Sequence, residues 1–161
     1  MIEITIQKKL TSALGAMSLD INTTIEKGNL VTIYGKSGAG KTTILRILAG
    51  LLSPDKGEIK VNETTWLNTT QGINLKPQKR KIGFVFQDFQ LLPDRNVKDN
   101  LHFVLRATGW TDETAIQNKI EEVLDKVNVK EYVNKMPHQL SGGEQQRVAI
   151  ARALLNNPDI I

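Results

Sequence analysis

The first half of the chain carries the apolar patterns of short β-strands. Apolar side chains occupy alternate positions in residues 2–6, 17–25 and 58–61, which predicts strands with one buried face. Residues 29–34 also read as a strand, and residues 82–86 are apolar enough to predict a fully buried one. Turn-forming residues separate these segments, so we expect a sheet with short connections.

Helical periodicity first appears in residues 41–52 and then dominates residues 96–155. Between them, the polar residues 62–80 predict a hairpin followed by a loop. One helix of the second half has apolar residues at i, i+4, i+7, i+8 and i+11, with Thr111 as its expected N-cap. The apolar face of that helix consists of Ile116, Ile120, Val123, Leu124 and Val127.

The last nine residues, ALLNNPDII, predict the end of a helix and the start of a strand. The helix is expected to end at Asn156 and Asn157, because Pro158 cannot continue it. Residues 159–161 then begin a β-branched stretch of the kind that suits a buried strand.

Composition places the chain among ordinary soluble domains. Of its 161 residues, 40% are hydrophobic and 24% charged, and it has no cysteine and no apolar run long enough for a transmembrane helix. The N-terminus lacks the apolar core of a signal peptide, so we expect a cytoplasmic protein. The net charge is +4, and we interpret its densest cluster as a solvated loop face in preference to a nucleic-acid patch. That cluster is Lys76, Lys79, Arg80 and Lys81.

Residues 35–42, GKSGAGKT, match the phosphate-binding pattern G-x-x-x-x-G-K-[ST] between a predicted strand and a predicted helix. Glycines at 35, 38 and 40 let the backbone wrap tightly, and its N–H groups would bind a polyphosphate at the helix N-terminus. Lys41 in the first helical turn is unfavourable by about 0.3–1 kcal/mol unless an anion lies there. We expect Lys41 to reach the terminal phosphates and Thr42 to bind Mg²⁺.

A second motif, LSGGEQQR, opens another predicted helix. Ser141 and Glu144 have the S-x-x-E spacing of a capping box. Gly142 and Gly143 then occupy the first helical positions, where each costs up to about 1 kcal/mol relative to alanine. Glycines there would let an anionic group approach bare N–H groups, so the chain has two phosphate-type sites.

Three stretches together resemble the ATP-binding subunits of ABC transporters: GKSGAGKTT, FVFQDFQLLP and LSGGEQQRVAIARALLNNPDII. Their order and spacing match that family over the whole chain. The resemblance implies an α/β P-loop NTPase fold of the ABC ATPase type, with an N-terminal antiparallel β part and a helical subdomain. It also implies ATP and Mg²⁺ as cofactors.

The resemblance assigns roles residue by residue. The phosphate loop would be Gly35, Lys36, Ser37, Gly38, Ala39, Gly40, Lys41, Thr42 and Thr43. Gln87 would contact Mg²⁺ and the attacking water, near the docking surface for membrane subunits. The signature residues would bind the nucleotide held by a second protomer in a head-to-tail homodimer, and these are Ser141, Gly142, Gly143 and Glu144.

On this interpretation the chain is one ABC ATPase domain. Residues 1–87 would be the ATP-binding core, residues 88–140 the helical subdomain, and residues 141–161 the signature helix with the start of the next strand. The family's subunits work on the cytoplasmic face of a cell membrane with membrane partners, and we expect no nucleic acid among the partners. A DNA-linked ATPase with coiled-coil arms would need far more than the 53 residues between Gln87 and Ser141.

The two halves resemble different branches of the family. MIEITIQKKLTS and GINLKPQKRKIGFVFQD resemble molybdate-importer ATPases, which makes molybdate or a related anion the expected cargo. The stretch from FQLLPDRNVKDNL through the signature resembles the cell-division ATPase that works with a membrane partner. A chimera of two paralogues joined near Gln87 is therefore an alternative hypothesis.

The sequence departs from the family where the adenine ring is expected to stack. Members usually place an aromatic residue some two dozen positions before the phosphate loop, but here no aromatic precedes Tyr34. Leu14 or Met17 would cover the ring instead, with less stacking energy and less discrimination between ATP and GTP.

The family continues from NPDII into a strand that ends in an Asp-Glu pair, followed by a switch histidine, and none of these lies within residues 1–161. His102 and His138 are in the wrong places to substitute. We therefore expect nucleotide binding without appreciable hydrolysis by this chain alone, and a truncated, non-hydrolysing fragment is a further alternative. The edges of residues 29–34 and 82–86 would also lack a neighbour, which predicts strand exchange between two copies.

Overall fold

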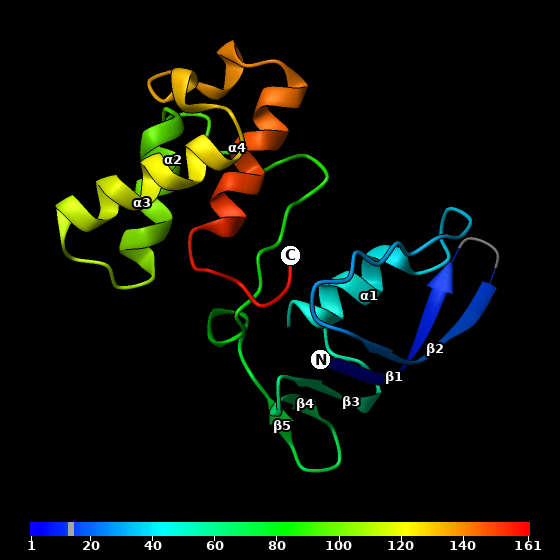
Figure 1. The fold of residues 1–161 in the computed structure, drawn as a ribbon. Coiled ribbons are helices and arrows are strands. Elements are labelled where there is room, and N and C mark those ends of the chain that lie inside the picture. Colours follow the sequence, from blue (N-terminus) through cyan, green and yellow to red (C-terminus); the bar gives the residue numbers. More distant parts are fainter. Residues whose placement is uncertain (13–14) are drawn as a thin grey trace. The chain divides into compact units, whose positions relative to one another are not determined.

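The computed structural model describes residues 1–12 and 15–161. Its contacts group the chain into two compact units, Met1–Arg80 and Lys81–Ile161. The first unit is built on a sheet, and the second consists mainly of helices (Figure 1).

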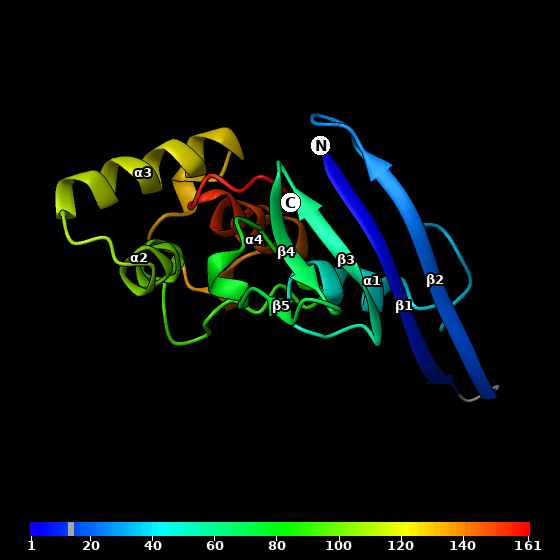
Figure 2. The same cartoon turned by 90° about the horizontal axis from the view of Figure 1, so that it is seen from below.

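The first unit contains a five-stranded antiparallel sheet in the order β2-β1-β3-β4-β5. Figure 2 shows β2, β1, β3 and β4 side by side. The alternation predicted from the sequence is confirmed, because Ile4, Ile6, Leu19 and Ile59 are buried along one face. The strands are β1 (Ile2–Ser12), β2 (Gly15–Ile25), β3 (Lys56–Val61), β4 (Thr64–Asn68) and β5 (Ile73–Asn74).

Helix α1 (Lys41–Leu48) belongs to the same unit and buries Ile44, Ile47 and Leu48. It lies within the predicted helix of residues 41–52 but ends earlier, because Gly50 follows with a left-handed φ of 75°. The hairpin and loop expected in residues 62–80 are present: β4 and β5 pair antiparallel within this range, and a 3₁₀ turn follows at Pro77–Lys79.

The strand predicted at residues 29–34 is not formed. Leu30 and Tyr34 are 97% and 98% exposed, and no strand pairing is recorded for this segment among the described residues. An apolar segment becomes a buried strand only when neighbouring strands accept its hydrogen bonds, and the local pattern cannot supply them.

The strand predicted at residues 82–86 is reduced to one parallel bridge between Ile82 and Ile160. Two backbone bonds form it: Gly83 N–H donates to Ile160 O over 2.8 Å, and Asp159 N–H donates to Lys81 O over 2.7 Å. The extended stretch expected after Pro158 therefore pairs at one position, whereas the long buried strand at 82–86 was a wrong prediction.

The second unit packs helices α2 (Val97–Ala107), α3 (Glu113–Lys126) and α4 (Gly142–Leu154) around one core, with 3₁₀ turns at Lys130–Tyr132 and Pro137–Gln139. The predicted apolar face of α3 is confirmed, because its residues join those of α2 and α4 in this core. The fully buried members include Leu101, Leu105, Ile116, Ile120, Leu124, Val148, Ala151 and Leu155.

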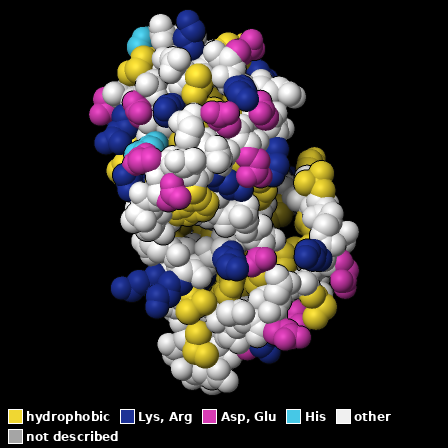
Figure 3. All heavy atoms as spheres, turned by 60° about the vertical axis from the view of Figure 1, so that its left-hand side comes forward, with side chains coloured by type: hydrophobic (Ala, Val, Ile, Leu, Met, Phe, Trp, Pro, Cys, Tyr) yellow, Lys and Arg dark blue, Asp and Glu magenta, His cyan; other side chains and the backbone are white. Residues whose placement is uncertain are grey.

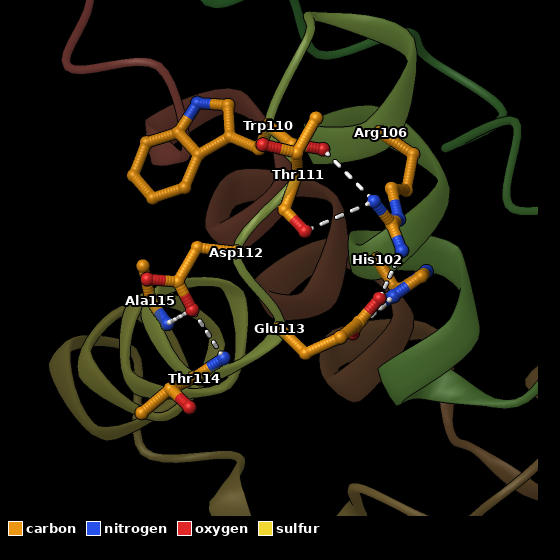
Figure 4. A network of polar contacts seen from close by, with 8 residues as sticks. All are labelled: His102, Arg106, Trp110, Thr111, Asp112, Glu113, Thr114 and Ala115. Carbon is orange, nitrogen blue, oxygen red and sulfur yellow. Dashed lines mark hydrogen bonds and ion pairs between the residues drawn. The ribbon is translucent and has the colours of Figure 1, made fainter.

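The connection between α2 and α3 is held by polar contacts (Figure 4). Asp112, and not Thr111, is the N-cap of α3, and its Oδ1 accepts from the N–H groups of Thr114 and Ala115 at 2.8 and 3.2 Å. The Thr111 carbonyl instead accepts from Arg106, which also pairs with Glu113. The prediction of Thr111 was one residue off because an aspartate next to it offers the stronger acceptor.

Charges on the face drawn in Figure 3 alternate in sign over much of the surface. On α3, Glu122 pairs with both Lys119 and Lys126, and just beyond the helix Lys130 pairs with Asp125. Exposed pairs of this kind contribute little to stability, and they break up any basic field. The expectation that the chain does not bind nucleic acid stays a prediction.

Candidate nucleotide-binding site

The glycine-rich loop of residues 35–40 leads directly into α1. Gly38 and Gly40 have φ values of 80° and 85°, and Gly40 is the N-cap of the helix. A Cβ on Gly40 would lie 3.0 Å from Leu10 Cδ1 and 3.4 Å from Leu19 Cδ1. Glycine is therefore required at position 40 both by the left-handed backbone and by the hairpin packed against it.

Among the described residues, the N-terminus of α1 has neither a side-chain cap nor an acidic residue in its first turn. Its first intrahelical bond runs from Ile44 N–H to Gly40 O over 3.0 Å, so the N–H groups of Lys41, Thr42 and Thr43 precede the helical ladder. The positive end of the helix dipole therefore meets a lysine rather than a carboxylate.

Lys41 lies across the loop that precedes it. Its ammonium donates to the carbonyl oxygens of Gly35 and Lys36 at 2.7 and 2.8 Å. These bonds place the charge beside the loop backbone, next to the N–H groups of the first turn. Thr42 is exposed in the same turn, as are Lys36 and Ser37 in the loop.

The far end of α1 is held by Arg80, which is only 4% exposed. Its guanidinium donates to the carbonyls of Ile47 and Leu48 at 2.8 and 2.6 Å and lies over the ring of Trp66. Burial lowers the pKa of Arg80. A Cβ on Gly50 would come within 2.8 Å of Arg80 Nε, so the arginine depends on a glycine there.

The position of Arg80 corrects the interpretation of residues 76–81 as a solvated basic cluster. Lys76, Lys79 and Lys81 are exposed as expected, whereas Arg80 is a buried cap for helical carbonyls. Sequence reasoning missed it because the carbonyls of Ile47 and Leu48 that it caps lie more than thirty positions earlier in the chain, and the cluster itself contains no sign of them.

Gln87 is exposed in the second unit and opens a tight turn. Two residues later, Phe89 and Gln90 both have left-handed φ values, of 57° and 47°. Arg152 on α4 donates to their carbonyl oxygens, at 2.6 Å to each. Burial lowers the pKa of Arg152.

The loop between this turn and α2 is organised by Asn100, a buried polar residue that the sequence did not single out. Its Oδ1 accepts from Leu92 N–H over 2.7 Å, and its Nδ2 donates to the carbonyls of Leu92, Arg95 and Asn96. A cavity of about 300 Å³ lies beside it. Its lining includes Phe84, Phe86, Gln90, Leu92, Phe103 and Arg152.

The signature segment forms the predicted capping box at the start of α4. Ser141 is the N-cap: Glu144 N–H donates to its Oγ over 3.4 Å, and Ser141 N–H donates to Glu144 Oε2 over 2.7 Å. These bonds with Ser141 are the main reason that the pKa of Glu144 is lowered. Tyr132 also contacts Glu144, and carboxylates at Glu144 and Glu131 raise the pKa of Tyr132 to about 12.

Gly142 and Gly143 are required by nothing in their surroundings. A Cβ on Gly142 would meet no described atom within 4 Å, and one on Gly143 would meet only Arg147 Nη1, at 3.9 Å. Neither residue has a positive φ. Their small size therefore leaves the N-terminus of α4 accessible without serving the fold of this chain.

Comparison with known proteins decides the family. The family model described as ABC transporter matches residues 19–161. The chain belongs to the ABC transporter family. Its predicted fold is thereby confirmed, because the ABC transporter cassette MJ0796, solved as a dimer, superimposes with a TM-score of 0.79 at 34% identity, covering 98% of this chain and 71% of the cassette.

Several importer ATP-binding proteins are relatives of this ABC chain. The molybdenum import ATP-binding protein ModC of Vibrio parahaemolyticus is 38% identical over 98% of the chain and 41% of its own length. The spermidine/putrescine import protein PotA of Nitrosomonas europaea is 41% identical over 88% of the chain and 37% of its own length. The methionine import protein MetN of Helicobacter hepaticus is 43% identical, with corresponding shares of 88% and 40%.

The chain thus spans about two fifths of the length of these curated relatives. The ModC match runs through both halves that the sequence likened to two branches. Within the described residues, no helix is long and apolar enough to cross a bilayer.

The two histidines lie away from the phosphate loop in sequence and have ordinary surroundings. His102 on α2 lies 3.1 Å from Glu113, and His138 is exposed in the 3₁₀ turn before the signature. Among the described residues, no group of three or more His, Asp or Glu side chains could hold a metal.

Proposed function

We propose that this chain binds MgATP through residues 35–43 and acts as the ATP-binding subunit of an ABC importer. The start of α1 carries the proposal: left-handed glycines, unsatisfied first-turn N–H groups and the Lys41 ammonium converge there, with no carboxylate in the first turn. In this proposal residues 1–87 are the ATP-binding core, residues 88–140 the helical subdomain and residues 141–161 the signature segment.

The proposed magnesium ligands are the Thr42 hydroxyl and the Gln87 side-chain oxygen. Both residues are exposed, and neither side chain has a recorded hydrogen bond within the described residues. A relative, the cassette MJ0796, has been solved bound to ADP and Pi. For the adenine ring, Met17 is half-buried on the sheet face that also carries Leu10 and Leu19, whereas Leu14 lies outside the described residues.

The signature residues Ser141, Gly142, Gly143 and Glu144 are proposed to contact the nucleotide of a second protomer, in a head-to-tail homodimer. The accessible glycines support this role, since helix N-termini bind anions when no side chain blocks the approach. The dimeric structure of MJ0796 also supports a paired arrangement.

Membrane subunits are the proposed partners, which would place the chain on the cytoplasmic face of the membrane. The cavity beside Asn100 supports a docking role for this region, because Phe103 is 45% exposed next to it and a partner side chain would cover it. Molybdate is the proposed cargo, and the ModC relatives support it.

The cargo proposal is tested by whether the chain binds the membrane subunits of a molybdate importer, a test that does not require the hydrolysis this chain is expected to lack. Binding to the membrane subunits of a methionine or polyamine importer instead would overturn the molybdate proposal and keep the importer proposal, because MetN and PotA are relatives as well.

The nucleotide proposal is tested by titrating the chain with MgATP in a calorimeter. Lys41→Ala should weaken binding by about a hundredfold, as expected when a charge-assisted phosphate contact is lost. Lys79→Ala is the matched control, since Lys79 is an exposed lysine of the same unit. Equal affinity of the wild type and Lys41→Ala would contradict the site.

A strand-exchanged dimer is a second proposed assembly, favoured by the exposed apolar segment of residues 29–34. It should form without nucleotide, whereas the head-to-tail dimer should require it. Light scattering in the absence of ATP, with Val31→Lys as the disrupting variant, separates the two. A monomer at all concentrations without nucleotide would contradict strand exchange.

A further inference from the structure

The turn that follows Gln87 is strained. Phe89 and Gln90 are consecutive non-glycine residues with φ values of 57° and 47°, a region that places Cβ close to the following carbonyl oxygen. The local bonds of the turn are few: Phe89 N–H donates to Phe86 O over 3.1 Å, and Gln90 N–H donates to Asp88 O over 2.6 Å. Such a backbone persists only when the surrounding structure holds it.

Arg152 supplies that hold. Its two terminal nitrogens donate separately to the carbonyls of Phe89 and Gln90, so one planar group grips both strained residues. Arg152 is half-buried, and among the described residues these two carbonyls are the hydrogen-bond partners of its guanidinium. A lysine at this position could not span both oxygens in the same fixed geometry.

The origin of Arg152 gives the grip a direction. Arg152 lies in the last turn of α4, and the signature lies in the first turn of the same helix. About 16 Å along the helix axis therefore separates Arg152 from Ser141. Val148, Ala149 and Ala151 are buried and fix the helix in the core of the second unit. A displacement of α4 would therefore act directly on the turn next to Gln87.

We propose that Arg152 is a positioning residue: by holding the carbonyls of Phe89 and Gln90 it keeps the left-handed turn closed and sets the orientation of Gln87. The role of Gln87 toward Mg²⁺ rests on the proposed function, whereas the grip on the turn does not. Releasing Arg152 relaxes Phe89 and Gln90 out of the left-handed region and frees Gln87.

Backbone amide exchange, measured by NMR without nucleotide, tests the grip. Arg152→Gln should raise the exchange rates of the Phe89 and Gln90 amides by about tenfold or more, since two charge-assisted bonds are lost. Arg152→Lys should give an intermediate rate. Arg106→Gln is the matched control, because Arg106 also donates to two backbone carbonyls of the second unit, at Trp110 and Thr111.

Glycine rescue distinguishes holding of the turn from general stabilisation. In the Arg152→Gln background, Gln90→Gly should restore most of the lost protection, because glycine adopts this φ without strain. Asn128→Gly is the control, as Asn128 has a φ of 55° elsewhere in the same unit and should restore nothing. Equal rescue by both glycines, or by neither, would overturn the proposal.

Two measurements keep the inference testable if Arg152→Gln does not fold. In the wild-type chain, NOEs should connect the Arg152 guanidinium protons to the backbone of residues 89–91, and their absence would overturn the proposal. The second measurement is the ratio of the ATP affinity in Mg²⁺ to the ATP affinity in EDTA. Arg152→Lys should reduce this ratio severalfold relative to the wild type. A wild type that does not bind ATP would refute the proposed function, and the amide exchange rates would still decide whether Arg152 holds the turn.

Discussion

Helices α1 and α4 both begin at glycines within phosphate-type motifs, yet the two starts are built in opposite ways. At α1, Gly40 is forced by its left-handed φ and by Leu10, and no side chain caps the helix. At α4, Ser141 and Glu144 cap each other through the N–H groups of Glu144 and Ser141, and a Cβ on Gly143 would meet only Arg147. The first start has no side-chain cap, whereas the second is capped and still leaves the N–H groups of Gly142 and Gly143 accessible.

This difference teaches that a glycine in a motif can have two meanings. A glycine that the backbone requires is a structural element of the site, and its loss damages the fold and binding together. A glycine that nothing in the chain requires is a clearance for something outside it. The following substitutions test that distinction, from the largest expected effect to the smallest.

Gly40→Ala should have the largest effect on stability. Alanine in the left-handed region costs about 1–2 kcal/mol, and the contact with Leu10 adds to this cost, so we expect a loss of roughly 2 kcal/mol. Urea denaturation of the purified chain measures it. Gly72→Ala is the control, because Gly72 has a φ of 70° in the same unit but no atom within 4 Å of its Cβ position. Equal losses at both positions would show that packing against Leu10 contributes nothing.

Ser141→Ala should lower stability by about 1 kcal/mol, because the capping box loses its acceptor for Glu144 N–H. Ser141→Asp should recover most of this loss, since aspartate is an equally good N-cap. Thermal unfolding followed by circular dichroism at the helical signal measures both variants. A neutral Ser141→Ala would mean that α4 does not depend on its cap, and the contrast with α1 would disappear.

Gly143→Ala should stabilise the chain, by up to about 1 kcal/mol, because alanine is the better helix former and its methyl group meets nothing closer than Arg147. The same variant should weaken nucleotide-dependent dimerisation, as the methyl group would project into the proposed approach path. Denaturation and sedimentation with MgATP measure the two effects. A destabilised Gly143→Ala would remove the distinction between required and accessible glycines.

The smallest expected effect is a pH dependence at the capped start. The pKa of Tyr132 is raised to about 12 in the folded chain, so its contribution is fully present below about pH 10 and is lost as the pH rises toward 12. The pKa of Glu144 is lowered, so its contribution is lost as the pH falls below its ordinary range. Tyr132→Phe should remove the loss of stability at alkaline pH and leave the loss at acid pH unchanged. The free energy of unfolding between about pH 9 and 12 measures this effect. An unchanged alkaline profile would contradict the Tyr132–Glu144 contact.

Features set by neighbours in sequence were predictable. The capping box needs two side chains three residues apart, the strands predicted at residues 2–6 and 17–25 need alternation, and the face of α3 needs a helical period, so all three follow from short stretches. The family was predictable for the same reason, since its motifs are short and contiguous. The expectation that residues 1–161 bind ATP without turnover stays a prediction, and phosphate release from the purified chain measures it.

Features that depend on distant partners were not predictable. Residues 29–34 have the composition of a strand, but strand formation depends on neighbours that no local pattern contains. Arg80 resembles its exposed neighbours in sequence and differs only because the carbonyls of α1 lie within its reach. Arg152 meets Phe89 and Gln90 across more than sixty positions, and nothing in either segment indicates the other.

The contact between Gly50 and Arg80 has a consequence for how the sequence can change over time. Any side chain at position 50 would occupy the volume that the guanidinium fills, and the left-handed φ adds a separate penalty. Part of the cost of changing position 50 therefore exists only while Arg80 is present. Substitutions at positions 50 and 80 are therefore epistatic, and their order matters. A lineage that first loses Arg80 can then accept alanine at position 50 more easily. A lineage that keeps Arg80 must keep Gly50.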